Sequence, residues 1–224
     1  MGLCGGQIRD SIVMTEFPWT SDESEQSHGY LLPPIEAYLA RRSGNMPSSL
    51  SVMDIGSGNG SMTAKIAAKG YKIVGVEPSS SGIQTARRSF PNVTFEEGSA
   101  YDDLAGRFGT FDIVLSCEVI EHLLHPQLFL SRVKDLLAPK GVAILTTPYH
   151  GYIKNVLISI AGKWDFHHHP DREWGHVKFF SRATLGKVAH AAGLQETEFH
   201  RVGRMPIIAK SMIMMLEAEG HSRP

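Results

Sequence analysis

The chain has 224 residues, of which 42% are hydrophobic and 20% are charged. This length fits one domain, or one domain with a modest insertion, and the ordinary composition excludes collagen-like, coiled-coil and wholly disordered chains. Lys and Arg total 22 against 23 Asp and Glu, a formal net charge of -1. Because a dedicated nucleic-acid binder is strongly basic, this balance argues against nucleic acid as the partner.

Cysteine usage and hydropathy indicate a reduced, cytoplasmic setting. Cys4 and Cys117 are too few for a disulfide framework. No apolar run approaches the ~18 residues that a membrane span needs. The opening residues, MGLCGGQIRDS, lack the basic flank and apolar stretch of a signal peptide. Peripheral membrane contact stays open, and nothing in the sequence calls for an obligate protein partner.

Helices and short apolar strands alternate along most of the chain. Residues 1–27 form an arm with Phe17 and Trp19 as its large side chains, and a helix is expected at about 30–42. Strands are then predicted at 51–56, 71–77, 92–96, 110–116 and 141–148, with helices at 61–69, 79–90 and 128–137. A last helix is capped by Ser181, and two more strands are expected at 195–202 and 207–216. This alternation indicates a parallel sheet covered on both faces, which binds ligands at the carboxyl ends of its strands.

Residues 149–180 interrupt the alternation with aromatic side chains and histidines. Long ordered insertions of this kind are lids or binding loops. We therefore divide the chain into an arm and helix at 1–48 and a main domain at 49–224, with 149–180 as a substrate lid. The run His167, His168 and His169 is interpreted as a solvated loop, because three adjacent side chains cannot all face one ion.

Three glycines at alternate positions, Gly56, Gly58 and Gly60, join the first strand to its helix. They allow a tight turn and let a ligand lie against the backbone, while the helix directs its positive end at that ligand. A dinucleotide fingerprint needs glycine at position 61, where the chain has Ser61. The glycine loop therefore does not indicate NAD.

Two acids, Asp54 and Glu77, lie at the ends of the first two strands. An acid there suits hydrogen bonds to ribose hydroxyls, and Asp54 favours an ammonium group over a pyrophosphate. An adenosine ligand that carries an amino acid, with a sulfonium between them, fits both acids. The alternative is that the glycines only permit the turn from strand to helix.

The segments VMDIGSGNG, VGVEPS, EEGSAYD and FDIVLSCEVIEHL together resemble the class I S-adenosylmethionine-dependent methyltransferases over residues 49–147. The resemblance implies an α/β, Rossmann-like fold with a doubly wound, mostly parallel seven-stranded sheet and an insertion after the fifth strand. It also implies that the glycine loop holds the methionine part of the cofactor and Glu77 the ribose, while Ser99 and Ala100 edge the adenine. The family often has Asp where this chain has Ser99, so we expect a backbone contact there.

Glu118, Glu121 and His122 follow the fourth strand, at a spacing that places all three side chains on one face of a helix. Two carboxylates and an imidazole side by side need a cation or a proton between them. One interpretation is a divalent metal, Mg or Mn, with His176 as a further ligand. The other is chemistry without metal, in which Glu118 supports the cofactor loop and His122 is the general base.

The stretch TTPYHGYIKN followed by GHVKFFSRATL is similar to the ubiquinone-biosynthesis O-methyltransferases and, more distantly, to the small-RNA 3′-terminal 2′-O-methyltransferases. The resemblance assigns their shared Glu-x-x-Glu-His and later His to Glu118, Glu121, His122 and His176. We predict O-methylation of a small, aromatic hydroxyl compound such as a quinone precursor. Two alternatives remain: 2′-O-methylation of an RNA end, which the charge balance disfavours, and a non-catalytic cofactor-binding module.

Overall fold

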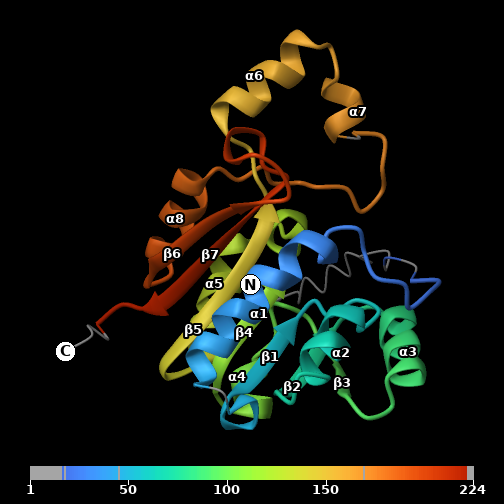
Figure 1. Ribbon diagram of the computed structural model, residues 1–224, viewed down its shortest axis with the longest axis vertical. Helices are drawn as coiled ribbons and strands as arrows, with labels where there is room; N and C mark the ends of the chain where they lie inside the picture. Colours follow the sequence, from blue (N-terminus) through green and yellow to red (C-terminus); the bar gives the residue numbers. More distant parts are fainter. Residues whose placement is uncertain (1–16, 18, 45, 169, 221–224) are drawn as a thin grey trace, which may run out of the picture.

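The computed structural model describes residues 17, 19–44, 46–168 and 170–220. Its sheet has seven strands in the order β3-β2-β1-β4-β5-β7-β6, with helices on both faces (Figure 1). The strands are β1 (Ser51–Ile55), β2 (Lys72–Glu77), β3 (Thr94–Glu97), β4 (Phe111–Cys117), β5 (Leu137–Pro148), β6 (Leu194–Val202) and β7 (Ser211–Ala218). Strands β1 to β5 pair in parallel, and β7 lies antiparallel between β5 and β6. The predicted seven-stranded, mostly parallel sheet is confirmed.

Eight helices and three short 3₁₀ turns connect the strands over the described residues. The helices are α1 (His28–Ser43), α2 (Ser61–Ala67), α3 (Ser80–Ser89), α4 (Leu104–Phe108), α5 (Pro126–Asp135), α6 (Tyr152–Ile160), α7 (Trp164–His168) and α8 (Arg182–Ala191). The turns are η1 (Pro47–Ser49), η2 (Ile120–His122) and η3 (Pro206–Ile208). Ser181 caps α8 as predicted, since its side chain accepts a hydrogen bond from the backbone of Thr184 and the reciprocal bond is also present.

Apolar side chains fill both faces of the sheet, because successive residues of a strand point to opposite sides. In β4, Ile113 and Leu115 join the core that includes Leu31 and Ile35 of α1, while Val114 joins the opposite core. That second core includes residues of α5 and α8. With both faces covered, the carboxyl ends of the strands and the loops that follow them are left for ligands.

The insertion differs from the solvated loop that the sequence suggested around its histidines. It contains α6 and α7, which project beyond the carboxyl end of β5 (Figure 1). His167 and His168 belong to α7, and the ring of His168 stacks on His150 at a centroid distance of 5.5 Å. The loop interpretation of these two residues is therefore wrong, because helix formation and ring packing order them; His169 lies outside the described residues.

Candidate cofactor and catalytic site

The glycine loop between β1 and α2 requires its glycines for backbone and packing reasons. Gly56, Gly58 and Gly60 have φ angles of 78°, 55° and 80°, in the left-handed region that favours glycine. A Cβ on Gly56 would lie 2.4 Å from Val119, and one on Gly60 would lie 2.6 Å from Phe95. The loop is thus shaped by its own protein neighbours as well as by any ligand.

Glu77 holds the glycine loop in place through hydrogen bonds to two backbone N–H groups. Its Oε2 accepts a hydrogen bond from the Gly58 N–H and its Oε1 accepts one from the Ser79 N–H, both at 3.0 Å. The structure therefore brings the predicted ribose-binding acid directly to the glycine loop. Asp54 lies in β1 and is buried, and its Oδ2 accepts a 2.6 Å hydrogen bond from the Thr63 hydroxyl of α2. Burial raises the pKa of Asp54 to about 6, with the negative charge of Glu77 adding to the rise against the Thr63 bond.

The described part of the arm before α1, residues 17 and 19–27, lies across the glycine loop. The indole of Trp19 covers Gly58 so closely that a Cβ there would lie 2.5 Å from the ring. The backbone N–H of Trp19 donates a hydrogen bond to the Ser81 hydroxyl at the start of α3. Asn59 Nδ2 donates to the carbonyls of Ser21 and Glu23, both at 2.9 Å. The sequence suggested an arm near the site but gave no sign that Trp19 contacts the loop.

A hollow of about 370 Å³ lies beside the expected adenine position. It is lined by Pro78, Glu97, Gly98, Ser99 and Asp102. The Ser99 N–H donates a 2.8 Å hydrogen bond to Asp102, so this acid occupies the backbone group that was expected to meet adenine. Ala100 is buried and belongs to the core below β1 and β4. Ser99 thus lines the hollow, whereas nothing in the sequence indicated that Pro78, Glu97 and Asp102 line it too.

The prediction that Glu118, Glu121 and His122 lie on one face of a helix is wrong. After β4 ends at Cys117, Glu118 adopts φ 54°, and only the single 3₁₀ turn η2 follows. Three side chains on one helical face would need a regular helix through all of them. Glu118 instead points to β5 and β7, where its carboxylate accepts hydrogen bonds from Thr146 at 2.8 Å and from Ser211 at 3.2 Å.

Glu121, His122 and His176 come together as a possible metal site. One ligand atom of each lies within 4.8 Å of the others, and Glu118 is not part of this group. Thr147 donates a 2.9 Å hydrogen bond to Glu121 Oε2, while Oε1 is buried without a hydrogen-bond partner among the described residues. The predicted partnership of His176 with the motif is therefore supported by geometry, with three residues rather than four.

Burial shifts the titration of this group. It raises the pKa of Glu121 well above its ordinary value, and the negative charge of Glu118 adds to this rise. It raises the pKa of Glu118 to about 7, against the hydrogen bonds from Thr146 and Ser211. It lowers the pKa of His122, so this imidazole is neutral at neutral pH. Both acids therefore hold a proton more readily than usual, and a bound cation would favour their ionised forms.

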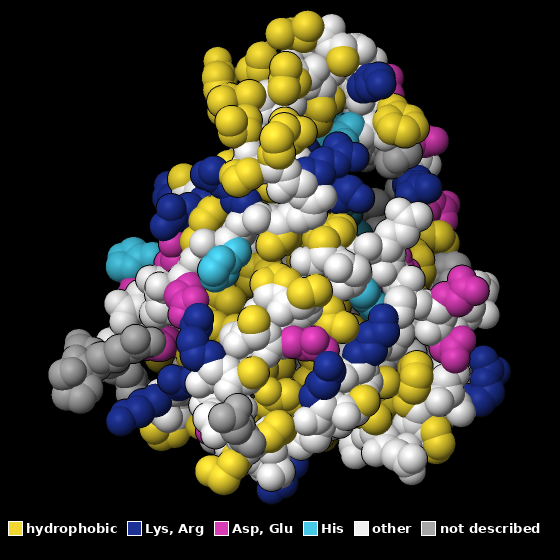
Figure 2. Space-filling model, viewed as in Figure 1, with side chains coloured by type: hydrophobic (Ala, Val, Ile, Leu, Met, Phe, Trp, Pro, Cys, Tyr) yellow, Lys and Arg dark blue, Asp and Glu magenta, His cyan; other side chains and the backbone are white. Residues whose placement is uncertain are grey.

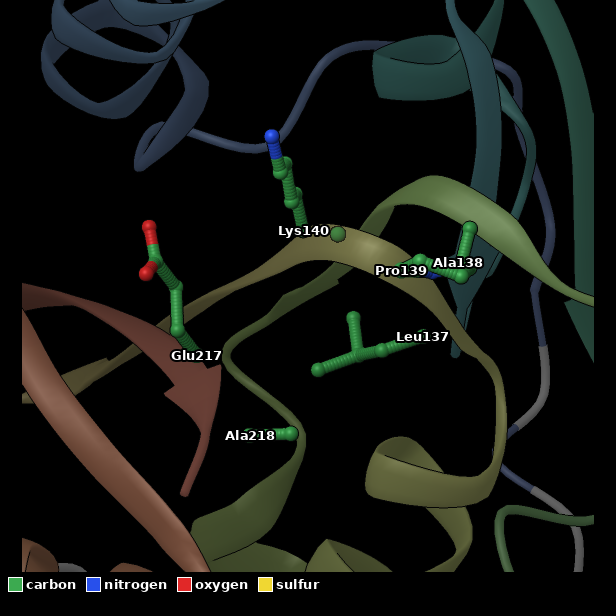
Figure 3. A pocket seen from close by; sticks show the side chains of 7 residues that line it. Leu137, Ala138, Pro139, Lys140, Glu217 and Ala218 are labelled. Atoms are coloured by element: carbon green, nitrogen blue, oxygen red, sulfur yellow. The ribbon is translucent and has the colours of Figure 1, made fainter. Parts of the chain in front are cut away.

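A second hollow, of about 170 Å³, lies at the opposite end of the sheet, where β5 begins (Figure 3). Leu137, Lys140, Glu217 and Ala218 are among the residues that line it. The predicted site residues instead lie at or beyond the carboxyl ends of β1 to β5. This hollow does not belong to the candidate site.

Comparison with known proteins agrees with this geometry. A family model described as a methyltransferase domain matches residues 27–198. The chain therefore belongs to the methyltransferase domain family, and its sheet has the class I, Rossmann-like arrangement.

The curated relatives share one description. The chain is 30% identical over 154 residues to the ubiquinone biosynthesis O-methyltransferase of Azorhizobium caulinodans, which covers 66% of this chain and 60% of that protein. It is 36% identical over 102 residues to the protein of the same description from a Caulobacter species, which covers 44% of this chain and 40% of that one. The chain thus spans less than two thirds of the length of either relative.

Solved methyltransferase structures share the fold. Magnesium protoporphyrin IX methyltransferase from Synechocystis PCC 6803, with bound S-adenosylhomocysteine, has a TM-score of 0.63 and 20% identity, covering 82% of this chain and 80% of its own. The Burkholderia thailandensis 1,6-didemethyltoxoflavin-N1-methyltransferase has a TM-score of 0.60 and 18% identity, covering 84% of this chain and 77% of its own. At these identities, the likeness is one of fold.

Proposed function

We propose that this protein is an S-adenosylmethionine-dependent O-methyltransferase whose acceptor is a small aromatic hydroxyl compound of the quinone-precursor type. The observation that carries the proposal is the placement of Glu121, His122 and His176 immediately beyond β4, the strand beside the glycine loop. Membership of the methyltransferase domain family supports the cofactor, and the name shared by the curated relatives supports oxygen as the methylated atom.

The cofactor is proposed to lie over the carboxyl ends of β1 and β2. Gly56, Gly58 and Gly60 would face its methionine part, with Asp54 below them, and Glu77 would face the ribose. Ser99 and Ala100 are proposed to border the adenine, and the hollow at Ser99 gives this end of the ligand room. Because Trp19 covers Gly58, we expect the arm to change position when the cofactor binds.

The residues present fit a divalent metal. Glu121 offers a buried carboxylate oxygen without a hydrogen-bond partner among the described residues, and leaving such an oxygen unpaired costs about 1–3 kcal/mol or more. His122 and His176 add imidazole nitrogens within 4.8 Å. Mixed carboxylate and imidazole ligands suit Mg or Mn as well as Fe or Zn. When bound, such an ion would lower the pKa of an acceptor hydroxyl.

In the alternative without a metal, in which His122 is not a ligand, His122 is proposed to receive the proton of the acceptor hydroxyl. Its Nδ1 lies 3.3 Å from the carbonyl oxygen of Gly175, and because a carbonyl only accepts, Nδ1 carries the proton and Nε2 keeps its lone pair. The acceptor oxygen then forms a bond to the methyl carbon while the bond from carbon to sulfur breaks, and its electron pair stays on sulfur. The products are a methyl ether and S-adenosylhomocysteine, with the proton passed to His122.

The lid supports the further proposal of peripheral contact with an anionic lipid surface. Large apolar side chains are exposed on α6, α7 and η3, and we call them the lid cap: Tyr152, Ile153, Leu157, Ile160, Trp164, Phe166, Met205 and Ile207. Figure 2 shows hydrophobic side chains gathered over α6, with Lys and Arg side chains below them. Exposed apolar groups of this extent mark an interaction surface.

The basic residues around the lid cap favour an anionic lipid surface as its partner. Asp165 is the only acid in residues 149–166 and none occurs in residues 199–216, whereas Lys163, Arg201 and Arg204 in these stretches are exposed. Apolar side chains beside basic ones suit an anionic bilayer. None of the described helices is long and apolar enough to cross a membrane.

Vesicle sedimentation tests this contact. The protein should bind vesicles that contain phosphatidylglycerol more than pure phosphatidylcholine vesicles, and the double variant Tyr152→Asp, Ile160→Asp should lose the binding. Leu128→Asp, on an exposed position of α5, is the matched control and should keep it. Equal binding by both variants would contradict the proposal, and so would loss of a dimer in the double variant, which would assign the lid cap to self-association.

Methyl transfer tests the central proposal. With labelled S-adenosylmethionine, we expect the methyl group on catechols or polyprenyl phenols, with an increase on adding Mg or Mn to protein dialysed against a chelator. Unchanged activity after dialysis would show that methyl transfer needs no metal. Transfer to short RNAs but to no phenol would overturn the acceptor class.

A further inference from the structure

Glu118 is held by a directed chain of hydroxyl groups from three separate elements. The Tyr30 hydroxyl of α1 lies 3.2 Å from Ser211 Oγ, and Ser211 in turn donates to Glu118 Oε2 at 3.2 Å. Thr146 of β5 donates to Glu118 Oε1 at 2.8 Å. Since Ser211 uses its proton on the carboxylate, Tyr30 must be the donor in the first bond. Both oxygens of Glu118 are therefore fixed, away from the Glu121 group.

The carboxylate of Glu118 lacks a partner cation among the described residues. No ion pair there involves Glu118 or Glu121. Burial raises the pKa of Glu118 to about 7 against the opposing charge of Lys154, whose ammonium donates hydrogen bonds to the carbonyls of Tyr149 and Lys210 instead. Glu118 is only half-buried, so a bound ligand can reach it. Glu118 and Glu121 therefore each lack a counter-charge among the described residues, and each needs a cation when it is ionised.

The neighbours of Glu118 indicate which cation meets it. Val119, the residue after Glu118, packs against Gly56, so the turn that carries Glu118 adjoins the loop proposed to hold the methionine part of the cofactor. Its φ of 54° is a strained conformation for a residue other than glycine, and such strain occurs where surrounding contacts enforce a functional position. The cofactor carries its sulfonium charge at the methionine part, whereas the imidazoles that suit a metal lie with Glu121.

We propose that Tyr30, Ser211 and Thr146 are positioning residues that hold Glu118 as the counter-charge of the cofactor's sulfonium, separate from the metal site at Glu121. This inference rests on the proposed function. Transfer of the methyl group turns the sulfonium into a neutral thioether, so Glu118 loses its cation with each reaction. The protein therefore binds the charged donor more tightly than the neutral product.

Binding of two cofactor analogues tests this role without turnover. S-adenosylhomocysteine is neutral at sulfur, whereas sinefungin carries a cationic amine near the same place. By calorimetry, the Kd ratio of S-adenosylhomocysteine to sinefungin should fall about tenfold in Glu118→Gln and about threefold in Ser211→Ala and Tyr30→Phe. Ser211→Thr keeps the hydroxyl and should restore the ratio, while thermal unfolding checks that each variant is folded.

Titration with Mn²⁺ gives the second arm. Glu118→Gln should keep the Mn²⁺ affinity within about twofold, whereas Glu121→Gln should lose at least about tenfold. Equal losses in both variants would make Glu118 a metal ligand and overturn the inference, and so would an unchanged Kd ratio in Glu118→Gln. If the unaltered protein binds neither analogue, the proposed cofactor itself is wrong, which is a distinct outcome.

Discussion

Thr147 and Glu121 are joined by a 2.9 Å hydrogen bond between β5 and η2, and both residues are buried. The bond fixes Oε2 of Glu121, and a carboxylate oxygen of this residue lies within 4.8 Å of ligand atoms of His122 and His176. Removing a partner that orients a ligand in this way typically lowers metal affinity by about 10- to 100-fold. Thr147 therefore belongs to the site although it would touch neither metal nor substrate.

Replacing Thr147 by Val should lower the affinity for Mn²⁺ by about 10- to 100-fold, because Glu121 loses the bond that orients it. Thr146→Val is the matched control, since Thr146 binds Glu118 rather than Glu121. Calorimetric titration of both metal-free variants measures the difference. The same loss in both would show that the two acids act as one metal site.

Trp19 should report cofactor binding. Its indole covers Gly58, so a ligand that lies along the glycine loop must change its surroundings. The chain has three tryptophans, and Trp164 lies exposed on the lid. In protein labelled with 5-fluorotryptophan, S-adenosylhomocysteine should shift the fluorine resonance of Trp19 and leave that of Trp164 in place. A resonance of Trp19 that stays fixed at saturating ligand would place the ligand elsewhere.

Asp54 should make stability depend on pH. Its pKa is about 6 in the folded protein against an ordinary value of 3.8, so the folded state binds more protons between these values. A raised carboxyl pKa means that the free energy of unfolding falls as pH rises from about 4 to about 6. Asp54→Asn removes this contribution, so the melting temperature of the variant should fall less over that range. Parallel melting profiles would contradict the assignment of the slope to Asp54.

Gly60→Ala should destabilise the protein by about 2–4 kcal/mol, because its Cβ would meet Phe95 and Ala86 at a φ of 80°. Gly186 in α8 is the matched control: a Cβ there meets nothing within 4 Å, so Gly186→Ala should stabilise by about 0.5–1 kcal/mol. Denaturant unfolding compares the two variants. A neutral effect of Gly60→Ala would mean that the loop relaxes around the added methyl group.

The fold was predictable because its signals are local. Apolar strands, glycine stops and the Ser181 cap each lie within a few residues of the boundary they mark, and the structure confirms the seven strands they predict. The glycine loop and Glu77 were also found, since a parallel sheet brings the ends of neighbouring strands together. No helix was predicted for α4, or for α6 and α7 within the insertion.

The rest of the site depends on contacts that sequence spacing does not encode. The spacing of Glu118 and Glu121 suggested a helix, but the left-handed conformation of Glu118 ends that pattern and sends the two acids to different partners. Ser211 reaches Glu118 across 93 positions because β7 pairs with β5. Trp19 reaches Gly58 through an arm without periodicity. The polar pair Thr146 and Thr147 was readable, since it interrupts an apolar strand where β5 ends.

A crystal structure with bound S-adenosylhomocysteine tests the central claim most directly. We predict that the ligand lies along Gly56 to Gly60, with its ribose at Glu77, its adenine at the hollow beside Ser99, and its sulfur facing Glu118. Density for the ligand at any other place, or a glycine loop still covered by Trp19 at saturating ligand, would contradict the account.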